Sequence, residues 1–131
     1  MGQAGKSILI VDDDKSILYV FTLILQKKGY NVETAETCRE AMKKAENQLF
    51  DLALIDAILP DVNGLELVSR LETMQPQMVK IIITGLPSEE NAATALNNGA
   101  SAFLTKPINP EILLNIIKEK LGNGKKELQK S

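Results

Sequence analysis

The sequence predicts an α/β fold in which one parallel sheet carries helices on both faces. Short apolar runs of strand length alternate five times with longer segments of helical period, which is the pattern of repeated strand–helix units. The runs that begin at residues 8, 52 and 80 are almost continuously apolar, as strands covered on both faces are. We therefore expect a doubly wound, five-stranded sheet with right-handed crossovers.

The strands can be placed from these runs. The run that follows the first helical segment is the most polar, so we expect that strand at an edge of the sheet. The expected strands are Ile8–Val11, Asn31–Thr34, Leu52–Ile55, Lys80–Thr84 and Ala102–Thr105.

The helices are marked by residues that satisfy the free backbone groups at helix ends. Between these signals, apolar residues recur at helical spacing, as in Ile17, Phe21 and Leu25. The start signals are Asp14, Thr37 with Glu40, Gly64, Ser88 and Asn109–Pro110, and the end signals are Gly29 and Gly99.

Composition limits the function classes. The chain has 131 residues, 44% of them hydrophobic, which suits one globular domain. A net charge of −2 gives no reason to expect contact with nucleic acid, and no apolar run is long enough for a membrane span. The single cysteine, Cys38, favours a reducing cytoplasmic setting. Histidine is absent, which excludes histidine-based triads and zinc sites and leaves oxygen ligands for any ion.

Polar residues follow four of the expected strands. Asp12 and Asp13 come after the first strand, and Asp56 after the third. Thr84 ends the fourth strand, and Lys106 follows the fifth. Because ligands bind at the carboxyl ends of strands in open parallel sheets, we expect these residues to form one site.

The charges of this site suggest its chemistry. Clustered carboxylates repel one another, so a divalent cation or a lysine is needed to compensate them. Mg2+ rests on one or two carboxylates together with phosphate oxygens, and a carboxylate can act as a nucleophile. Asp12 and Asp13 could hold the metal while Asp56 attacks phosphorus, with Lys106 and Thr84 contacting the phosphoryl oxygens.

Four motifs in order, "ILIVDDD", "LALIDAILPDVNGLEL", "IIITG" and "FLTKP", give the chain a resemblance. It resembles the CheY-like receiver domain of two-component response regulators from about Lys6 to Leu121. The resemblance implies a flavodoxin-like sheet of strand order 2-1-3-4-5, with residues 6–122 as the receiver domain. Residues 1–5 are then expected to be a flexible N-terminus, and residues 123–131 a tail or the start of a linker.

The resemblance also implies a role for each site residue. Asp56 would be the phosphoacceptor, and Lys106 and Thr84 would contact the phosphate. Asp12, Asp13, Asp56 and the backbone carbonyl of Ile58 would hold Mg2+, with Mn2+ as the alternative. Thr84 would also act as a switch together with Phe103. Pro107 would follow a cis peptide bond.

The expected mechanism is that of a phosphorelay switch. The resemblance implies that a sensor histidine kinase or histidine phosphotransfer protein donates the phosphoryl group. Because the chain has no histidine, the donor would be another protein or a small molecule. The chain would catalyse only its own phosphorylation and dephosphorylation. The face built by the fourth helix, fifth strand and fifth helix would then engage an output domain or downstream protein. We expect a cytoplasmic monomer or weak homodimer without direct contact to nucleic acid or membrane.

Two alternatives remain open at this stage. "VDDDK" contains Asp-x-Asp after an apolar strand, which resembles haloacid-dehalogenase phosphatases, with Asp12 as nucleophile and Asp14 as acid. The other alternative is a binding module that is not phosphorylated. Outside the site, Asp14 is interpreted first as a helix cap, and Asp51 and Asp61 as solvated loop residues.

Overall fold

The computed structural model describes residues 5–86 and 88–123. The predicted N-terminal segment and tail lie almost wholly outside these residues, so their character stays a prediction. Strands and helices alternate five times over the described part: β1 (Ser7–Val11), α1 (Lys15–Lys27), β2 (Asn31–Ala35), α2 (Cys38–Asn47), β3 (Leu52–Asp56), α3 (Gly64–Met74), β4 (Val79–Thr84), α4 (Glu89–Asn97), β5 (Ala102–Thr105) and α5 (Pro110–Asn123).

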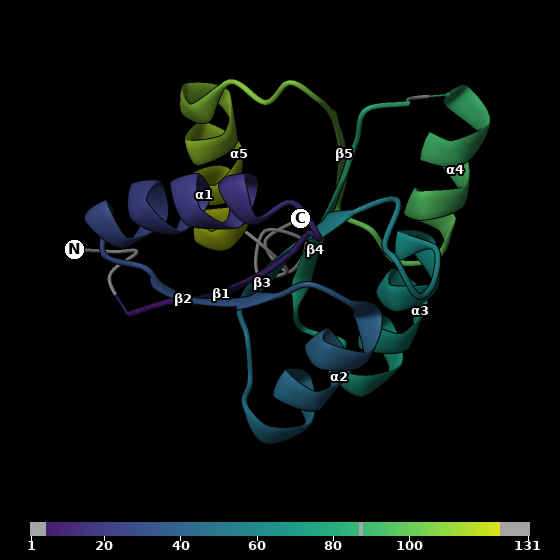
Figure 1. Ribbon diagram of the computed structural model, residues 1–131, viewed down its shortest axis with the longest axis horizontal. Helices are drawn as coiled ribbons and strands as arrows, with labels where there is room; N and C mark the ends of the chain where they lie inside the picture. The colour runs from purple at the N-terminus through teal and green to yellow at the C-terminus, as the bar shows by residue number, and fades with distance from the viewer. Residues whose placement is uncertain (1–4, 87, 124–131) are drawn as a thin grey trace.

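The sheet has the order β2-β1-β3-β4-β5, and every pair of neighbours is parallel. Helices α1 and α5 cover one face, while α2, α3 and α4 cover the other (Figure 1). The predicted doubly wound fold and its strand order are confirmed, and the polar strand β2 lies at an edge as expected.

Two apolar layers hold the helices to the sheet, because alternate residues of a strand point to opposite faces. Ile8 and Ile10 of β1 pack with buried residues of α1 and α5. Leu9 and Val11 pack with those of α2, α3 and α4. The central strands are therefore apolar at nearly every position, which explains their continuous hydrophobic runs.

The predicted helix caps are present. The Asp14 carboxylate accepts hydrogen bonds from Ser16 N and Ile17 N at the start of α1. The Thr37 hydroxyl accepts one from Glu40 N, while the Glu40 carboxylate accepts from the backbone of Glu36 rather than from Thr37 itself. The other expected start and end residues lie where predicted: Ser88 and Asn109 cap α4 and α5, α3 begins at Gly64 after the cap Asn63, and Gly29 and Gly99 have positive φ after α1 and α4.

None of the helices in the described part of the chain is long and apolar enough to span a membrane.

Candidate functional site

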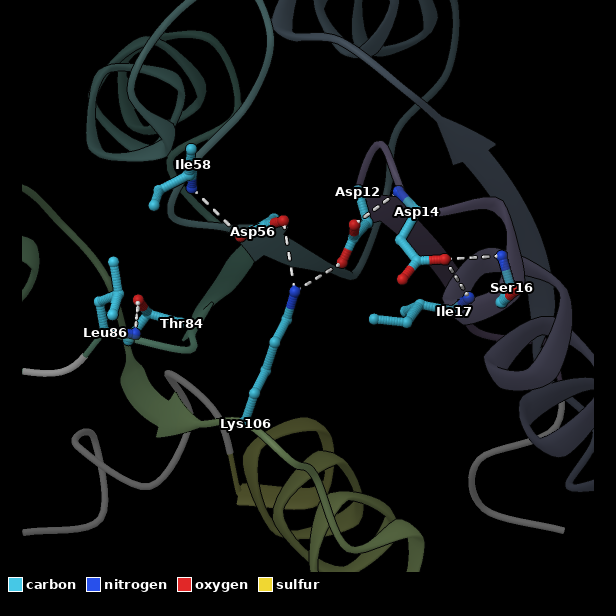
Figure 2. Close-up of polar contacts among 9 residues, drawn as sticks. All are labelled: Asp12, Asp14, Ser16, Ile17, Asp56, Ile58, Thr84, Leu86 and Lys106. Atoms are coloured by element: carbon cyan, nitrogen blue, oxygen red, sulfur yellow. Dashed lines mark hydrogen bonds and ion pairs between the residues drawn. The ribbon is translucent and has the colours of Figure 1, made fainter.

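The carboxyl ends of four strands converge on one site (Figure 2). Asp56 is the last residue of β3 and Thr84 the last of β4. Asp12 follows β1, which pairs with β3, and Lys106 follows β5, which pairs with β4. The strand order thus brings together residues that are up to 94 positions apart in the chain.

Three carboxylates form the acidic part of the site. Asp12, Asp13 and Asp56 each offer an oxygen, and these oxygens lie within 4.8 Å of one another. Asp12 and Asp56 are buried, with 4% and 8% exposure, whereas Asp13 is exposed. Burial raises the pKa of Asp12 and the charge of Asp56 raises it further, against hydrogen bonding from the Asp14 backbone and the charge of Lys106.

Lys106 supplies the positive charge. Its ammonium nitrogen lies 3.4 Å from Asp12 Oδ2 and 3.4 Å from Asp56 Oδ2. Desolvation alone would lower the pKa of Lys106, but the charges of the two carboxylates outweigh it and raise the pKa. One ammonium pairs with two of the three carboxylates, so the ionised cluster keeps an excess of negative charge that suits a divalent cation.

The loop after β3 fixes the orientation of Asp56. Ile58 N donates to Asp56 Oδ1 over 3.1 Å, and Gly64 N donates to the Ala57 carbonyl over 2.7 Å. A Cβ atom at Gly64 would lie 2.1 Å from the Asp56 carbonyl oxygen, so only glycine fits there. The sequence marked Gly64 as a helix start, but its contact with the Asp56 backbone appears only in three dimensions.

Thr84, at the end of β4, lies on the side of Asp56 opposite Asp12, which follows β1. It is 3% exposed, and its hydroxyl accepts a hydrogen bond from Leu86 N over 3.0 Å. Phe103 is half-buried and, with Thr84, lines a cavity of about 220 Å3. The remaining lining residues are Ala57, Ile58, Asn63, Leu65, Leu86 and Asn91.

The entrance to the site is apolar. Ile58 and Leu86 are 60% and 70% exposed and project on the side of the site away from Asp12 (Figure 2). Neither side chain can donate or accept a hydrogen bond.

The Lys106–Pro107 peptide bond, just after β5, is cis.

A second cavity, of about 420 Å3, lies beside Lys106. Its walls are apolar apart from the three charged site residues. The lining comes from the sheet, α1 and the loop before α5: Ile10, Val11, Asp12, Ile17, Phe21, Leu54, Asp56, Ile83, Lys106, Pro107 and Ile108.

Two acidic residues outside the cluster were interpreted too simply from the sequence. Asp61 Oδ1 accepts from Cys38 N and Oδ2 from Arg39 N, both over 3.0 Å, so this exposed residue caps α2. Asp51 Oδ2 accepts from Ser7 N over 2.8 Å. Both contacts join segments more than 20 residues apart, so no local pattern signals them.

A family model described as the response regulator receiver domain matches residues 8–118. The chain belongs to this family. A crystal structure of a CheY-like receiver domain protein from Methanospirillum hungatei JF-1 is 48% identical to this receiver domain, with a TM-score of 0.91. The match covers 95% of this chain and 99% of that one.

Two further relatives are informative. A response regulator protein from Burkholderia pseudomallei, solved with a phosphorylated aspartic acid, calcium ion and citrate, is 30% identical, with a TM-score of 0.83 over 93% of this receiver domain and 72% of that chain. The alkaline phosphatase synthesis transcriptional regulatory protein PhoP of Bacillus subtilis is 35% identical over 81% of this chain and 44% of its own length. The receiver domain spans less than half the length of the curated relatives it matches.

Neither alternative function is favoured. The match to receiver domains runs through all four strand-end motifs, which the phosphatase alternative does not require. Asp14, the acid in that alternative, instead accepts hydrogen bonds from the first turn of α1. The unphosphorylated module is disfavoured because the acidic cluster, the hydroxyl and the lysine are all present at one site.

Proposed function

We propose that Asp56 is the phosphoacceptor of this receiver domain. The observation that carries the proposal is the position of its carboxylate. Oδ1 accepts a hydrogen bond from Ile58 N, and Oδ2 lies 3.4 Å from the Lys106 ammonium, beside Asp12 and Asp13. The nucleophile is thus buried at a strand end, oriented by the backbone and next to positive charge.

The reaction is transfer of a phosphoryl group to a carboxylate. An oxygen of Asp56 forms a bond to phosphorus while the bond between phosphorus and the donor nitrogen breaks. The bonding electrons stay on the donor imidazole. The donor we assign is a phosphohistidine of a sensor kinase or phosphotransfer protein, on the ground of membership in the receiver family. The phosphorylated state ends by hydrolysis. Water attacks phosphorus, the acyl phosphate bond breaks, and inorganic phosphate and the free carboxylate are released.

A divalent cation fits the acidic cluster. Asp12, Asp13, Asp56 and the Ile58 carbonyl offer only oxygen ligands, the set preferred by Mg2+, with Mn2+ as the alternative. The buried, mutually repelling carboxylates also leave negative charge for a cation to compensate. When bound, the cation supplies positive charge that offsets the charge of the phosphoryl oxygens. The related Burkholderia structure with a phosphorylated aspartic acid and a calcium ion supports this assignment.

Lys106 and Thr84 bind the transferred group. The Lys106 ammonium already faces Asp56 and can donate a hydrogen bond to a phosphoryl oxygen. The Thr84 hydroxyl accepts from Leu86 N, which leaves its own hydrogen free for donation. These donors stabilise the charge that develops during transfer and hold the phosphorylated state afterwards.

Phe103 transmits the change to the surface. It lines the same cavity as Thr84, so a shift of Thr84 toward the phosphate changes the space available to the ring. The resulting two-state change is read at the face of α4, β5 and α5 by an output domain or a downstream protein. PhoP is a transcriptional regulatory protein of which this chain matches 44%, so we assign any contact with DNA in such a protein to its segments outside the receiver domain. We place the domain in the cytoplasm as a monomer or weak homodimer.

The proposal is tested by intact-mass spectrometry after incubation with acetyl phosphate and magnesium chloride. We expect one added phosphoryl group in the wild type that requires magnesium. Asp56→Asn should abolish it, whereas Asp51→Asn should not, since the Asp51 carboxylate lies outside the acidic cluster and accepts from Ser7 N. Borohydride reduction followed by peptide mapping locates the adduct. An adduct that survives Asp56→Asn refutes the proposal, and an adduct on Asp12 instead supports the phosphatase alternative.

A further inference from the structure

Asp61 joins the loop after β3 to the start of α2. Its two carboxylate oxygens accept hydrogen bonds from Cys38 N and Arg39 N, each over 3.0 Å. Hydrogen bonding, first from Cys38 N, lowers the pKa of Asp61. A carboxylate at a helix N-terminus also interacts favourably with the helix dipole.

Asp61 and Thr37 divide the capping of α2 between them. The Thr37 hydroxyl accepts from Glu40 N, while Asp61 takes the donors of the two preceding residues. Thr37 belongs to the chain just before α2, so its contact is local. Asp61 is 23 residues away from Cys38 in sequence, so its contact restrains a second segment as well as the helix.

The segment that Asp61 restrains carries two groups of the acidic site. It runs from Asp56 to Gly64 and includes the Ile58 backbone. Its base is closed by hydrogen bonds from Ala57 N to the Ile83 carbonyl and from Gly64 N to the Ala57 carbonyl. An isolated bridge pairs Ile58 with Asn63.

The outer part of the loop has fewer restraints. Leu59 is 7% exposed and packs in the layer under α2 and α3, whereas Pro60 and Asp61 are exposed. The Asp61 carboxylate links this outer turn to α2 through its two hydrogen bonds and fixes the turn against the helix. Loss of this contact would free the turn that immediately follows Ile58.

We propose that Asp61 is a positioning residue of the metal site: by anchoring the loop to α2 it holds the Ile58 carbonyl beside the carboxylates. The inference rests on the proposed function, in which that carbonyl is a Mg2+ ligand. Residues that orient ligands through a second contact commonly contribute about ten- to a hundredfold to metal affinity. Asp61 acts through two intervening residues, Leu59 and Pro60, so we expect the lower end of that range.

The test compares Asp61→Ala with Thr37→Ala in the whole chain. Each variant removes capping from the same helix and should lower the melting temperature by a similar few degrees. Titration calorimetry with magnesium chloride should give about tenfold weaker binding for Asp61→Ala and less than twofold for Thr37→Ala. Asp61→Asn keeps one acceptor oxygen and should fall between Asp61→Ala and the wild type.

A second readout needs no metal. Hydrogen exchange of the metal-free protein should be faster at the Ile58 and Gly64 amides in Asp61→Ala, but not in Thr37→Ala. Equal magnesium affinities of the two alanine variants, or unchanged exchange at Ile58, would overturn the positioning role. Failure of the proposed function looks different, because the wild type itself would then bind no magnesium and accept no phosphoryl group.

Discussion

Lys80 offers a sharp test of how a buried charge contributes to stability. Its side chain is 0% exposed on β4, and its ammonium lies 2.6 Å from Glu72 Oε1 on α3. The ammonium also donates to the Met78 carbonyl over 2.8 Å. The Glu72 side chain is 39% exposed although its Oε1 is buried, so solvent reaches part of Glu72 but none of Lys80.

This asymmetry predicts unequal costs for the two single substitutions. Glu72→Ala leaves the ammonium buried with one carbonyl partner. Breaking a fully buried pair in this way costs about 3–5 kcal/mol, and access of water at Glu72 reduces our expectation to about 2 kcal/mol. Lys80→Met removes the buried charge, fills similar volume and frees Glu72 to turn toward water. We therefore expect Lys80→Met to change the free energy of unfolding by no more than about 1 kcal/mol.

Urea denaturation of the metal-free protein measures both variants and the double variant. The midpoint should fall in Glu72→Ala with little change in the m-value. Adding Lys80→Met to Glu72→Ala should restore most of the loss, giving a coupling of about 1–2 kcal/mol. The reasoning is refuted if Lys80→Met costs as much as Glu72→Ala, or if the two costs simply add.

Three other predictions concern the site and the opposite end of the sheet. The pKa of Asp12 is raised in the folded protein, so its ionised carboxylate destabilises the fold as pH rises through that folded-state pKa. Asp12→Asn should therefore raise the melting temperature of the metal-free protein and abolish stabilisation by magnesium. A lower melting temperature would contradict this reasoning. Ile58→Asn and Leu86→Glu should each speed loss of the phosphoryl mass about tenfold by orienting water, and an unchanged rate would contradict the view that the apolar entrance prolongs the phosphorylated state. The buried Gln75 accepts a hydrogen bond from Phe50 N and donates to two carbonyls at the end of α2. Gln75→Leu should therefore lower the free energy of unfolding, measured by urea denaturation, by about 2–4 kcal/mol. A loss under about 1 kcal/mol would show that water replaces these bonds.

The elements and the location of the site follow from local sequence patterns. Helix caps such as Asp14 and Thr37 bond within three residues, so their signals lie side by side in the chain. The residues after each apolar run could be assigned to one site because parallel strands present their carboxyl ends at one edge. The parallel arrangement of the strands predicts that Asp12 and Asp56 lie close together, but it does not specify which groups balance their charges.

The tertiary structure decided the contacts between segments that are distant in sequence. Lys80 reads as a polar residue at the start of a strand, but the approach of α3 buries it against Glu72. Asp61 reads as a turn residue, but the position of α2 makes it a helix cap. By itself, the sequence determined the alternating elements and which chemical groups end each strand, because periodicity and capping act over a few residues. Packing decided the partner of each charge, because an ion pair or cap across the fold depends on distances that only the assembled layers define.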